Sequence, residues 1–180
     1  MNGTNEKRKI AIFDLDDTLV VTEAKIRVLN RLGKEITALT PAQFNSFTKK
    51  RHHVLNFEDF DNSAILKEGK MIASIFSIFR NMLMRGDDIS IITGRSSKKL
   101  VLDFFLGRGI RFRNDLVFAV NDPASPFTGT VSERKKQAIE VLISKGYNDF
   151  IFFDDHIDNL TLAKELEKEK GVTVETVHVT

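Results

Sequence analysis

Several short, continuous apolar runs divide the chain, and stretches with helical spacing separate them. The runs lie at 10–15 (IAIFDL), 89–93 (ISIIT), 116–120 (LVFAV) and 149–155 (DFIFFDD), and a last strand-like segment lies at 172–179. Such a run is typical of a strand that is covered on both faces. Strands that alternate with helices predict an α/β fold, with a parallel sheet and helices on both of its faces.

The stretches between the runs carry the signals of helices. We expect helices at 22–33, 40–55, 64–86, 98–109, 132–146 and 156–171. Gly33 suits the end of the first helix, and Thr40 followed by Pro41 suits the start of the second. Ser132 is the expected cap of the helix that begins there.

The chain length fits one domain. Its 180 residues are 42% hydrophobic, which is enough for a sizeable core. Residues 1–9 are polar and are expected to form a flexible lead-in. Between the first two apolar runs the chain is longer than one helix and a turn require. We therefore expect a small helical lid over about 24–62, which partly closes a site.

Composition excludes several classes of protein. The chain has no Cys, which rules out disulfides and thiolate metal sites, and no apolar stretch approaches the ~20 residues of a membrane span. The net charge is +2, and only KKRHH at 49–53 and RFR at 111–113 are local basic spots. Fifteen Phe against one Tyr and no Trp favour core packing over a base-stacking surface. We expect a cytoplasmic protein with no membrane association and no obligate protein partner.

Polar side chains follow three of the apolar runs, where the predicted strands end. Asp14 and Asp16 follow the first run, Thr93 ends the second, and Asp154 and Asp155 end the fourth. In parallel sheets the ligand site lies beyond the carboxyl ends of the strands. We therefore expect these side chains to converge at one edge of the sheet.

The helix at 132–146 brings a lysine, Lys135 or Lys136, toward the same edge. Four or five converging carboxylates predict a hard divalent cation, and Mg²⁺ prefers oxygen ligands. The Thr93 hydroxyl, the free backbone N–H groups from Gly94 onward and a lysine suit an anion beside that cation. A cation, an anion cradle and a carboxylate nucleophile are typical of phosphoryl transfer through an aspartyl-phosphate.

Four motifs, in order along the chain, resemble those of the haloacid dehalogenase (HAD) superfamily: DLDDTL, IITGR, KKQAIEVL and FFDD. Together they extend from Asp14 to Asn159. The resemblance implies a Rossmann-like, three-layer α/β/α fold. Asp17 stands where many members of the superfamily have Gly, and that position tolerates both residues.

The resemblance also implies roles for individual residues. Asp14 is then the nucleophile, and Asp16 is the general acid that protonates the leaving oxygen and afterwards the base that activates water. Thr93 hydrogen-bonds the phosphoryl group. Lys135 is the lysine of the site, with Lys136 as the alternative.

Further residues are expected to hold the substrate and the metal. Gly94 and Arg95 follow Thr93 and are candidates for contact with the substrate phosphate, although Arg95 also suits an ordinary surface position. The expected ligands of Mg²⁺ are Asp14, Asp16 and Asp155, with Asp154 or Asp158 in support.

These residues predict a Mg²⁺-dependent phosphomonoester hydrolase. Family ATPases carry Thr where this chain has Asp16, and an acid there favours rapid hydrolysis of the acyl-phosphate.

The Asp154-Asp155 doublet also occurs in polynucleotide 3′-phosphatases and deoxyribonucleotidases. A small lid leaves the site open, which favours a nucleotide or a 3′-phosphorylated nucleic-acid end over a small phosphorylated sugar. The alternative is a non-catalytic phosphoacceptor or binding protein on the same fold.

Overall fold

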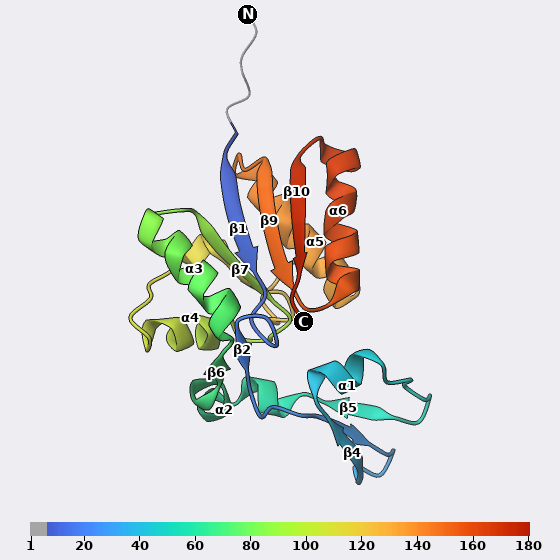
Figure 1. Ribbon diagram of the computed structural model, residues 1–180. Helices are drawn as coiled ribbons and strands as arrows, with labels where there is room; N and C mark the ends of the chain where they lie inside the picture. Colours follow the sequence, from blue (N-terminus) through green and yellow to red (C-terminus); the bar gives the residue numbers. More distant parts are fainter. Residues whose placement is uncertain (1–6) are drawn as a thin grey trace, which may run out of the picture.

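A computed structural model describes residues 7–180 (Figure 1). Its centre is a five-stranded parallel sheet with the order β10-β9-β1-β7-β8. The strands are β1 (Lys9–Phe13), β7 (Ile89–Thr93), β8 (Val117–Ala119), β9 (Asp149–Asp154) and β10 (Thr173–His178). Phe13 at the end of β1 pairs with Phe153 of β9 and with Ile91 of β7, so the carboxyl ends of the central strands lie together. The expected α/β fold with a parallel sheet is confirmed.

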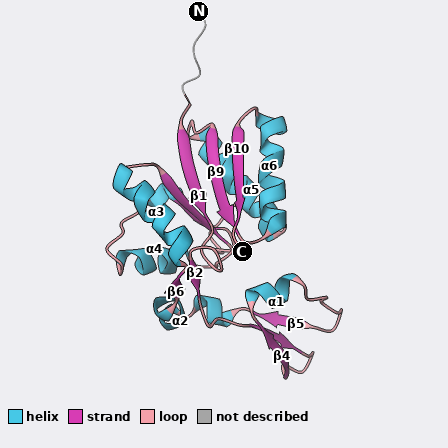
Figure 2. Ribbon diagram, viewed as in Figure 1, coloured by secondary structure: helices cyan, strands magenta, loops and turns pink. Residues whose placement is uncertain are grey.

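Helices cover both faces of this sheet (Figure 2). They are α3 (Ala73–Arg85) and α4 (Lys98–Leu106) on one face, and α5 (Val131–Ser144) and α6 (Ile157–Lys170) on the other. Successive residues of β1 alternate between the two apolar clusters. Ala11 and Phe13 belong to the cluster with α3 and α4, whereas Ile10 and Ile12 belong to the cluster with α5 and α6. Burial on both faces explains why the strands in the middle of the sheet, β1, β7 and β9, are mostly apolar.

The start of α5 differs from the expectation. Thr130, not Ser132, caps this helix: its hydroxyl accepts the Glu133 N–H, and the Glu133 carboxylate accepts the Thr130 N–H. Such a reciprocal pair satisfies two of the free donors at a helix start. Ser132 therefore lies in the first turn, where its hydroxyl donates to Asn159 Oδ1 at 2.7 Å.

An insertion lies between β1 and β7, and we call its residues 22–69 the lid. Its elements are β3 (Ile26–Leu29), β4 (Glu35–Leu39), α1 (Pro41–Asn45), β5 (Val54–Asn56), the 3-10 helix η1 (Glu58–Asp61) and α2 (Ser63–Glu68). The three strands form an antiparallel sheet in the order β4-β3-β5. The lid lies beyond the carboxyl ends of the central strands (Figure 1).

In place of the expected helical lid over 24–62, the structure has a three-stranded antiparallel sheet (β4-β3-β5) with the short helices α1 and η1 beside it. Ala24, Ile26 and Val28 are buried, which is the alternation of a strand. A spacing of four residues, as between Ala24 and Val28, fits both a strand and a helix. Leu32, the next residue at that spacing, is 93% exposed in the turn between β3 and β4, and Gly33 adopts a positive φ of 77° there.

The second expected helix of the lid is short. Thr40 and Pro41 begin α1 as expected, with Gln43 completing a capping box, but the helix ends at Asn45. The basic segment 49–53 follows it as an exposed turn that leads into β5. Lys49, Lys50 and Arg51 carry like charges and this segment offers no apolar face, so nothing extends the helix through it.

The expected long helix over 64–86 is interrupted at Gly69. α2 ends there, β6 (Lys70–Met71) pairs antiparallel with β2 (Val20–Val21), and α3 begins afterwards. A Cβ atom on Gly69 would lie 2.6 Å from Val20 Cγ2. The Gly69 backbone therefore packs closely against the Val20 side chain, and the paired strands β2 and β6 connect the lid to the core.

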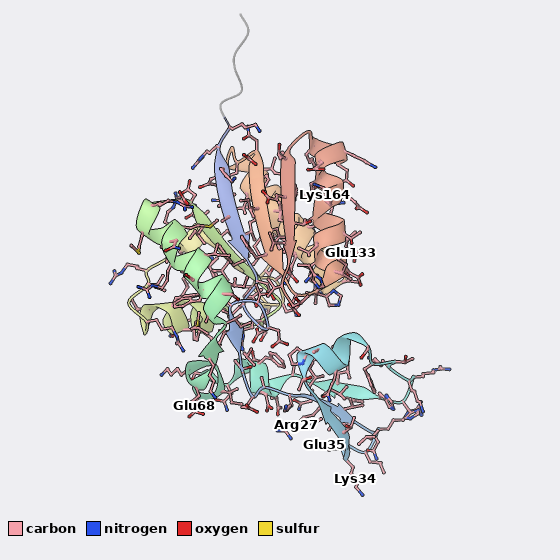
Figure 3. All side chains as sticks on the ribbon, in the orientation of Figure 1. Arg27, Lys34, Glu35, Glu68, Glu133 and Lys164 are labelled. Atoms are coloured by element: carbon pink, nitrogen blue, oxygen red, sulfur yellow. The ribbon has the colours of Figure 1, made fainter. Side chains whose placement is uncertain are left out.

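Charged side chains connect the elements of the lid. Arg27 on β3 contacts Glu35 on β4 at 2.9 Å and Asp59 in η1 at 3.4 Å, and Figure 3 labels Arg27 and Glu35 on these neighbouring strands. Asp59 also accepts the Lys25 N–H at 3.0 Å. These contacts hold η1 beside the lid sheet. Phe60 and Asp61 of η1 are directed to the central strands.

The expected lead-in at 1–9 lies for the most part outside the described residues, and Lys9 already belongs to β1. One further short element, the 3-10 helix η2 (Asn114–Leu116), precedes β8. Within 7–180, none of the helices combines the length and the hydropathy that crossing a membrane requires.

Candidate active site

Buried charged groups meet where β1 and β9 end. Asp14 directly follows β1, Asp154 ends β9, and Lys135 approaches from the second turn of α5. The Lys135 ammonium group contacts Asp14 Oδ1 at 2.9 Å and Asp154 Oδ2 at 2.7 Å. The sequence left Lys135 and Lys136 as alternatives. Lys136 instead faces α6, where it contacts Glu165 at 2.9 Å and Glu169 at 2.8 Å.

The acids at this point outnumber the lysine. Carboxylate oxygens of Asp14, Asp154 and Asp155 lie within 4.8 Å of one another. Asp154 is already engaged, because its Oδ1 accepts the His156 N–H at 2.9 Å and the Asn159 side-chain amide at 2.8 Å. Asp14 and Asp155 are less engaged among the residues that the structure describes: Asp14 Oδ1 contacts Lys135, and Asp155 Oδ1 accepts a hydrogen bond from Thr18 at 3.3 Å. An excess of negative charge, presented by oxygen atoms alone, fits a hard divalent cation such as Mg²⁺.

The environment shifts the pKa of Asp14, Asp155 and Lys135. Burial raises the pKa of Asp14 well above its usual value, Lys135 opposes this rise, and Asp154 and Asp155 add to it. Burial also raises the pKa of Asp155, with a further rise from Asp154. Burial by itself lowers the pKa of Lys135, but Asp14 and Asp154 outweigh it, so that this pKa is raised. The lysine is therefore protonated among carboxylates that carry their negative charge at a cost.

Asp16 lies apart from this group of acids and pairs with Arg95. The Arg95 Nε donates to Asp16 Oδ2 at 2.9 Å, and the Arg95 Nη2 donates to Asp16 Oδ1 at 2.6 Å. The third nitrogen of the same guanidinium donates to the carbonyl oxygen of Phe60 in the lid. Arg95 is only 2% exposed, so it is no ordinary surface arginine. It orients Asp16 and connects that carboxylate to the lid.

A tight turn after β1 places Asp16. The Asp17 N–H donates to the Val20 carbonyl at 2.8 Å, and the Leu19 and Val20 N–H groups both donate to the Leu15 carbonyl at 2.9 Å. Asp17 takes a positive φ of 56° in this turn, a conformation that Asp tolerates better than most residues. Burial raises its pKa to about 6, with smaller contributions from Asp155 and Asp16.

Thr93 and Gly94 end β7 at the same edge. Thr93 is buried, and its hydroxyl accepts the Arg95 N–H at 3.3 Å. The Gly94 carbonyl accepts the Asn121 side-chain amide at 2.6 Å, and Asn121 Oδ1 in turn accepts from Arg134 at 2.9 Å. This chain of contacts fixes the loop after β7. Asp158 lies outside the site, exposed in the first turn of α6.

One cavity of about 450 Å³ opens between this edge and the lid. Asp14, Asp16, Thr93, Gly94, Arg95, Lys135 and Asp155, all of them expected site residues, line it. Asn121, Ser132, His156 and Asn159 from the core and Ile26, Pro41, Phe44, Phe57, Phe60 and Asp61 from the lid also line it. The core residues follow strands or lie at the starts of helices, so their place in the site can be predicted from the sequence. Nothing in the sequence around the lid residues indicates that they line the cavity.

Neither a scan against protein-family models nor a search of curated proteins finds a match for this chain.

Proposed function

We propose that the chain is a Mg²⁺-dependent phosphomonoester hydrolase of the HAD type, which acts through an aspartyl-phosphate on Asp14. The observation that carries the proposal is the buried Asp14 carboxylate, which faces a cavity and shares one lysine with a second acid. A carboxylate in this setting is poised to attack an electrophile and has a cation beside it to offset the charge of a phosphate.

In the first step an oxygen of Asp14 attacks the phosphorus, and the bond from phosphorus to the leaving oxygen breaks. For this step Asp16 has to be protonated and to give up one of its two hydrogen bonds from Arg95; it then gives its proton to that oxygen, so the product leaves as an alcohol. In the second step Asp16 accepts a proton from water, and the water oxygen attacks the phosphorus. The bond to Asp14 breaks, which releases inorganic phosphate and restores the carboxylate.

The other residues of the cavity hold the phosphoryl group. Lys135 and the Thr93 hydroxyl are the donors expected for its oxygens, as Lys135 already bridges Asp14 and Asp154. Asp14 and Asp155 would hold Mg²⁺, which supplies charge stabilisation to the phosphoryl oxygens when bound. Asp154 keeps Lys135 in place through its own hydrogen bonds.

Asp16 favours hydrolysis over a lasting phosphoprotein. It lines the same cavity as Asp14, and Arg95 holds both of its oxygens. An oriented carboxylate in this place can take a proton from water, which the second step needs. A module that only stores a phosphoryl group has no use for such a base.

Hydrolysis of p-nitrophenyl phosphate, with Mg²⁺ and with EDTA, tests the proposal. We expect turnover that requires Mg²⁺ and is lost in Asp14→Asn. We also expect Asp16→Asn to accumulate phosphoprotein after acid quenching, because the second step lacks its base.

Lys136→Met is the matched control for Lys135→Met, since Lys136 pairs with Glu165 and Glu169 on the outside of α6. We expect Lys136→Met to keep full activity and Lys135→Met to lose at least about 100-fold in kcat/KM. A stable phosphoprotein formed by the wild-type chain from acetyl phosphate, without turnover of any ester, would instead identify a phosphoacceptor.

A further inference from the structure

The lid gives the cavity an aromatic wall, which we define as Phe44, Phe57 and Phe60. Phe44 lies on α1, Phe57 follows β5, and Phe60 lies in η1. The Phe44 and Phe57 rings meet edge to face, with centroids 5.8 Å apart, and Phe57 and Phe60 are 6.4 Å apart. Phe57 is 45% exposed although it is a large apolar side chain. The wall therefore has ring surface that the protein itself leaves uncovered.

Phe60 is held firmly in this wall. Its carbonyl accepts a hydrogen bond from Arg95, and the Arg95 guanidinium lies over its ring, 5.5 Å from the centroid. Asp61, the next residue, accepts a hydrogen bond from Ser96 at the end of β7. The wall is thus fixed at the edge of the sheet that carries Asp14 and Thr93, and both belong to one cavity.

The core side and the lid side of the cavity suit different chemical groups of a ligand. The core side offers charged and hydrogen-bonding groups. On the lid side, among the residues described, the only charged side chain is Asp61, and Ser96 already engages it. A sugar phosphate would place hydroxyl groups against Phe rings, where they lose hydrogen bonds to water without replacement. A flat base that stacks with its face against the Phe rings keeps its polar edge free for hydrogen bonds.

We propose that the aromatic wall stacks the base of a nucleotide whose phosphate is bound at Asp14 and Lys135. This rests on the proposed function, since it places the phosphomonoester at the nucleophile. The cavity volume of about 450 Å³ lies within the range that small-molecule sites commonly have, ~300–1,000 Å³. Base stacking on aromatic side chains is tolerant of sequence, because every base has a π-face. We therefore expect the four common bases to be accepted with similar efficiency.

Steady-state hydrolysis of nucleoside monophosphates and of glycerol phosphate tests the stacking. We expect wild type to prefer the nucleotides, and Phe57→Ala to lower the ratio of the two kcat/KM values about tenfold. Phe57→Tyr, which keeps a ring, should restore most of that ratio. Leu32→Ala is the matched control, because Leu32 is an exposed apolar residue of the lid outside the cavity, and we expect it to change neither substrate.

A binding measurement separates the stacking from the chemistry. Calorimetry of the Asp14→Asn protein with a nucleoside monophosphate and Mg²⁺ should show binding that Phe57→Ala weakens about tenfold. If no ester is hydrolysed by wild type but this Phe57-dependent binding persists, the nucleotide subsite stands and the phosphatase does not. If wild type hydrolyses esters with the same kcat/KM for nucleotides and for glycerol phosphate, the phosphatase proposal is supported and the base-stacking subsite is contradicted.

The same nucleotide chemistry occurs free and at the end of a nucleic-acid strand. A comparison of mononucleotides with 3′-phosphorylated oligonucleotides distinguishes the two sources. The basic turn at 49–53 is in the lid, whereas 111–113 precedes β8 at the opposite edge of the sheet and cannot reach the cavity. If the substrate is the end of a nucleic-acid strand, kcat/KM rises with the length of the oligonucleotide and falls as the salt concentration increases. This salt dependence is lost when Lys49, Lys50 and Arg51 are replaced by Ala. For a free nucleotide, length and salt have little effect.

A preference for phosphotyrosine or for sugar phosphates over every nucleotide would overturn the proposal. So would Phe57→Ala and Phe44→Ala variants that fold, as judged by circular dichroism, and keep the wild-type preference for nucleotides.

Discussion

Asp14 is placed where its charge is useful for chemistry and unfavourable for folding. It is buried, its one cationic partner is shared with Asp154, and Asp155 lies beside it. The pKa of Asp14 is raised above the value of the unfolded chain, chiefly by burial. Such a group stabilises the fold fully only below its unfolded pKa, and this contribution is lost as the pH rises through the folded pKa.

The variant Asp14→Asn should therefore be more stable than wild type when no metal is present. We expect a gain in the free energy of unfolding at pH 7.5 in EDTA, because the Asn amide carries no charge that burial would penalise. The gain should shrink toward zero below about pH 3, under the unfolded pKa of 3.8, where wild-type Asp14 is protonated in both states. Urea unfolding across this pH range measures it. A variant less stable than wild type at pH 7.5 would show that the contact with Lys135 outweighs the repulsion.

Asp17 offers a second and smaller test of the same kind. Its pKa is raised to about 6, and an acid with a raised pKa destabilises the fold as the pH rises through that value. Asn keeps the shape and tolerates the positive φ, so Asp17→Asn should gain stability above pH 6 and nothing below pH 4. Because Asp17 is only half-buried, we expect less than about 1 kcal/mol. The difference between the two unfolding curves in EDTA, followed against pH, is the measurement.

Between elements, Arg95 joins the end of β7 to the turn after β1 and to η1 of the lid. A lysine carries the same charge but cannot hold two carboxylate oxygens and a carbonyl at once. We expect Arg95→Lys to lower kcat about 10- to 100-fold on a small ester, with a change in KM below about threefold. The thermal midpoint should fall much less than activity does.

Arg113→Lys is the matched control for this variant. Arg113 also contacts both oxygens of one carboxylate, Asp115, at 3.2 and 2.9 Å, but it lies at the other edge of the sheet. Equal losses of activity in the two variants would show that Arg95 contributes to folding in general and does not position Asp16.

The junction of the lid with the core depends on the absence of a side chain at Gly69. A methyl group there would meet Val20 Cγ2 at 2.6 Å, and Val20 is completely buried. We expect Gly69→Ala to destabilise the protein by about 1–3 kcal/mol in thermal or urea unfolding. Gly107→Ala is the control: its added methyl group has its closest contact at 3.4 Å, and its φ of −62° suits alanine. Replacement of Val20 by Ala should rescue Gly69→Ala in part.

At the scale of the molecule, a bound cation should stabilise the whole fold. The acids that would hold it come from β1 and from the end of β9, so separation of these strands destroys the site. Saturation of such a site at 100 times its Kd adds about 2.7 kcal/mol to the free energy of unfolding. We expect thermal unfolding to move upward with Mg²⁺, and Asp155→Asn to lose most of the shift. An unchanged midpoint over a full Mg²⁺ titration would contradict the metal site.

The central sheet was predictable from the sequence because β1, β7, β8 and β9 are short runs of mostly apolar residues. Ile10 to Phe13 must be buried on both faces, and only helices on both sides achieve this. The acids after the strands were predictable for the same reason, since they follow those runs directly. The lid was not predictable in this way. Ala24 and Val28 fit two periodicities, and no short-range pattern relates Phe57 to Asp14.

The chain enters and leaves the lid at neighbouring points, since Val21 of β2 lies opposite Lys70 of β6. A turn of about two residues is enough to join such partners in a hairpin. Residues 22–69 can therefore be lengthened, shortened or exchanged for another segment without any change in the paths of β1 and β7. If the proposed function holds, mutation and recombination can act on what the protein recognises in one stretch of the gene and leave the stretches that encode Asp14, Thr93 and Lys135 untouched.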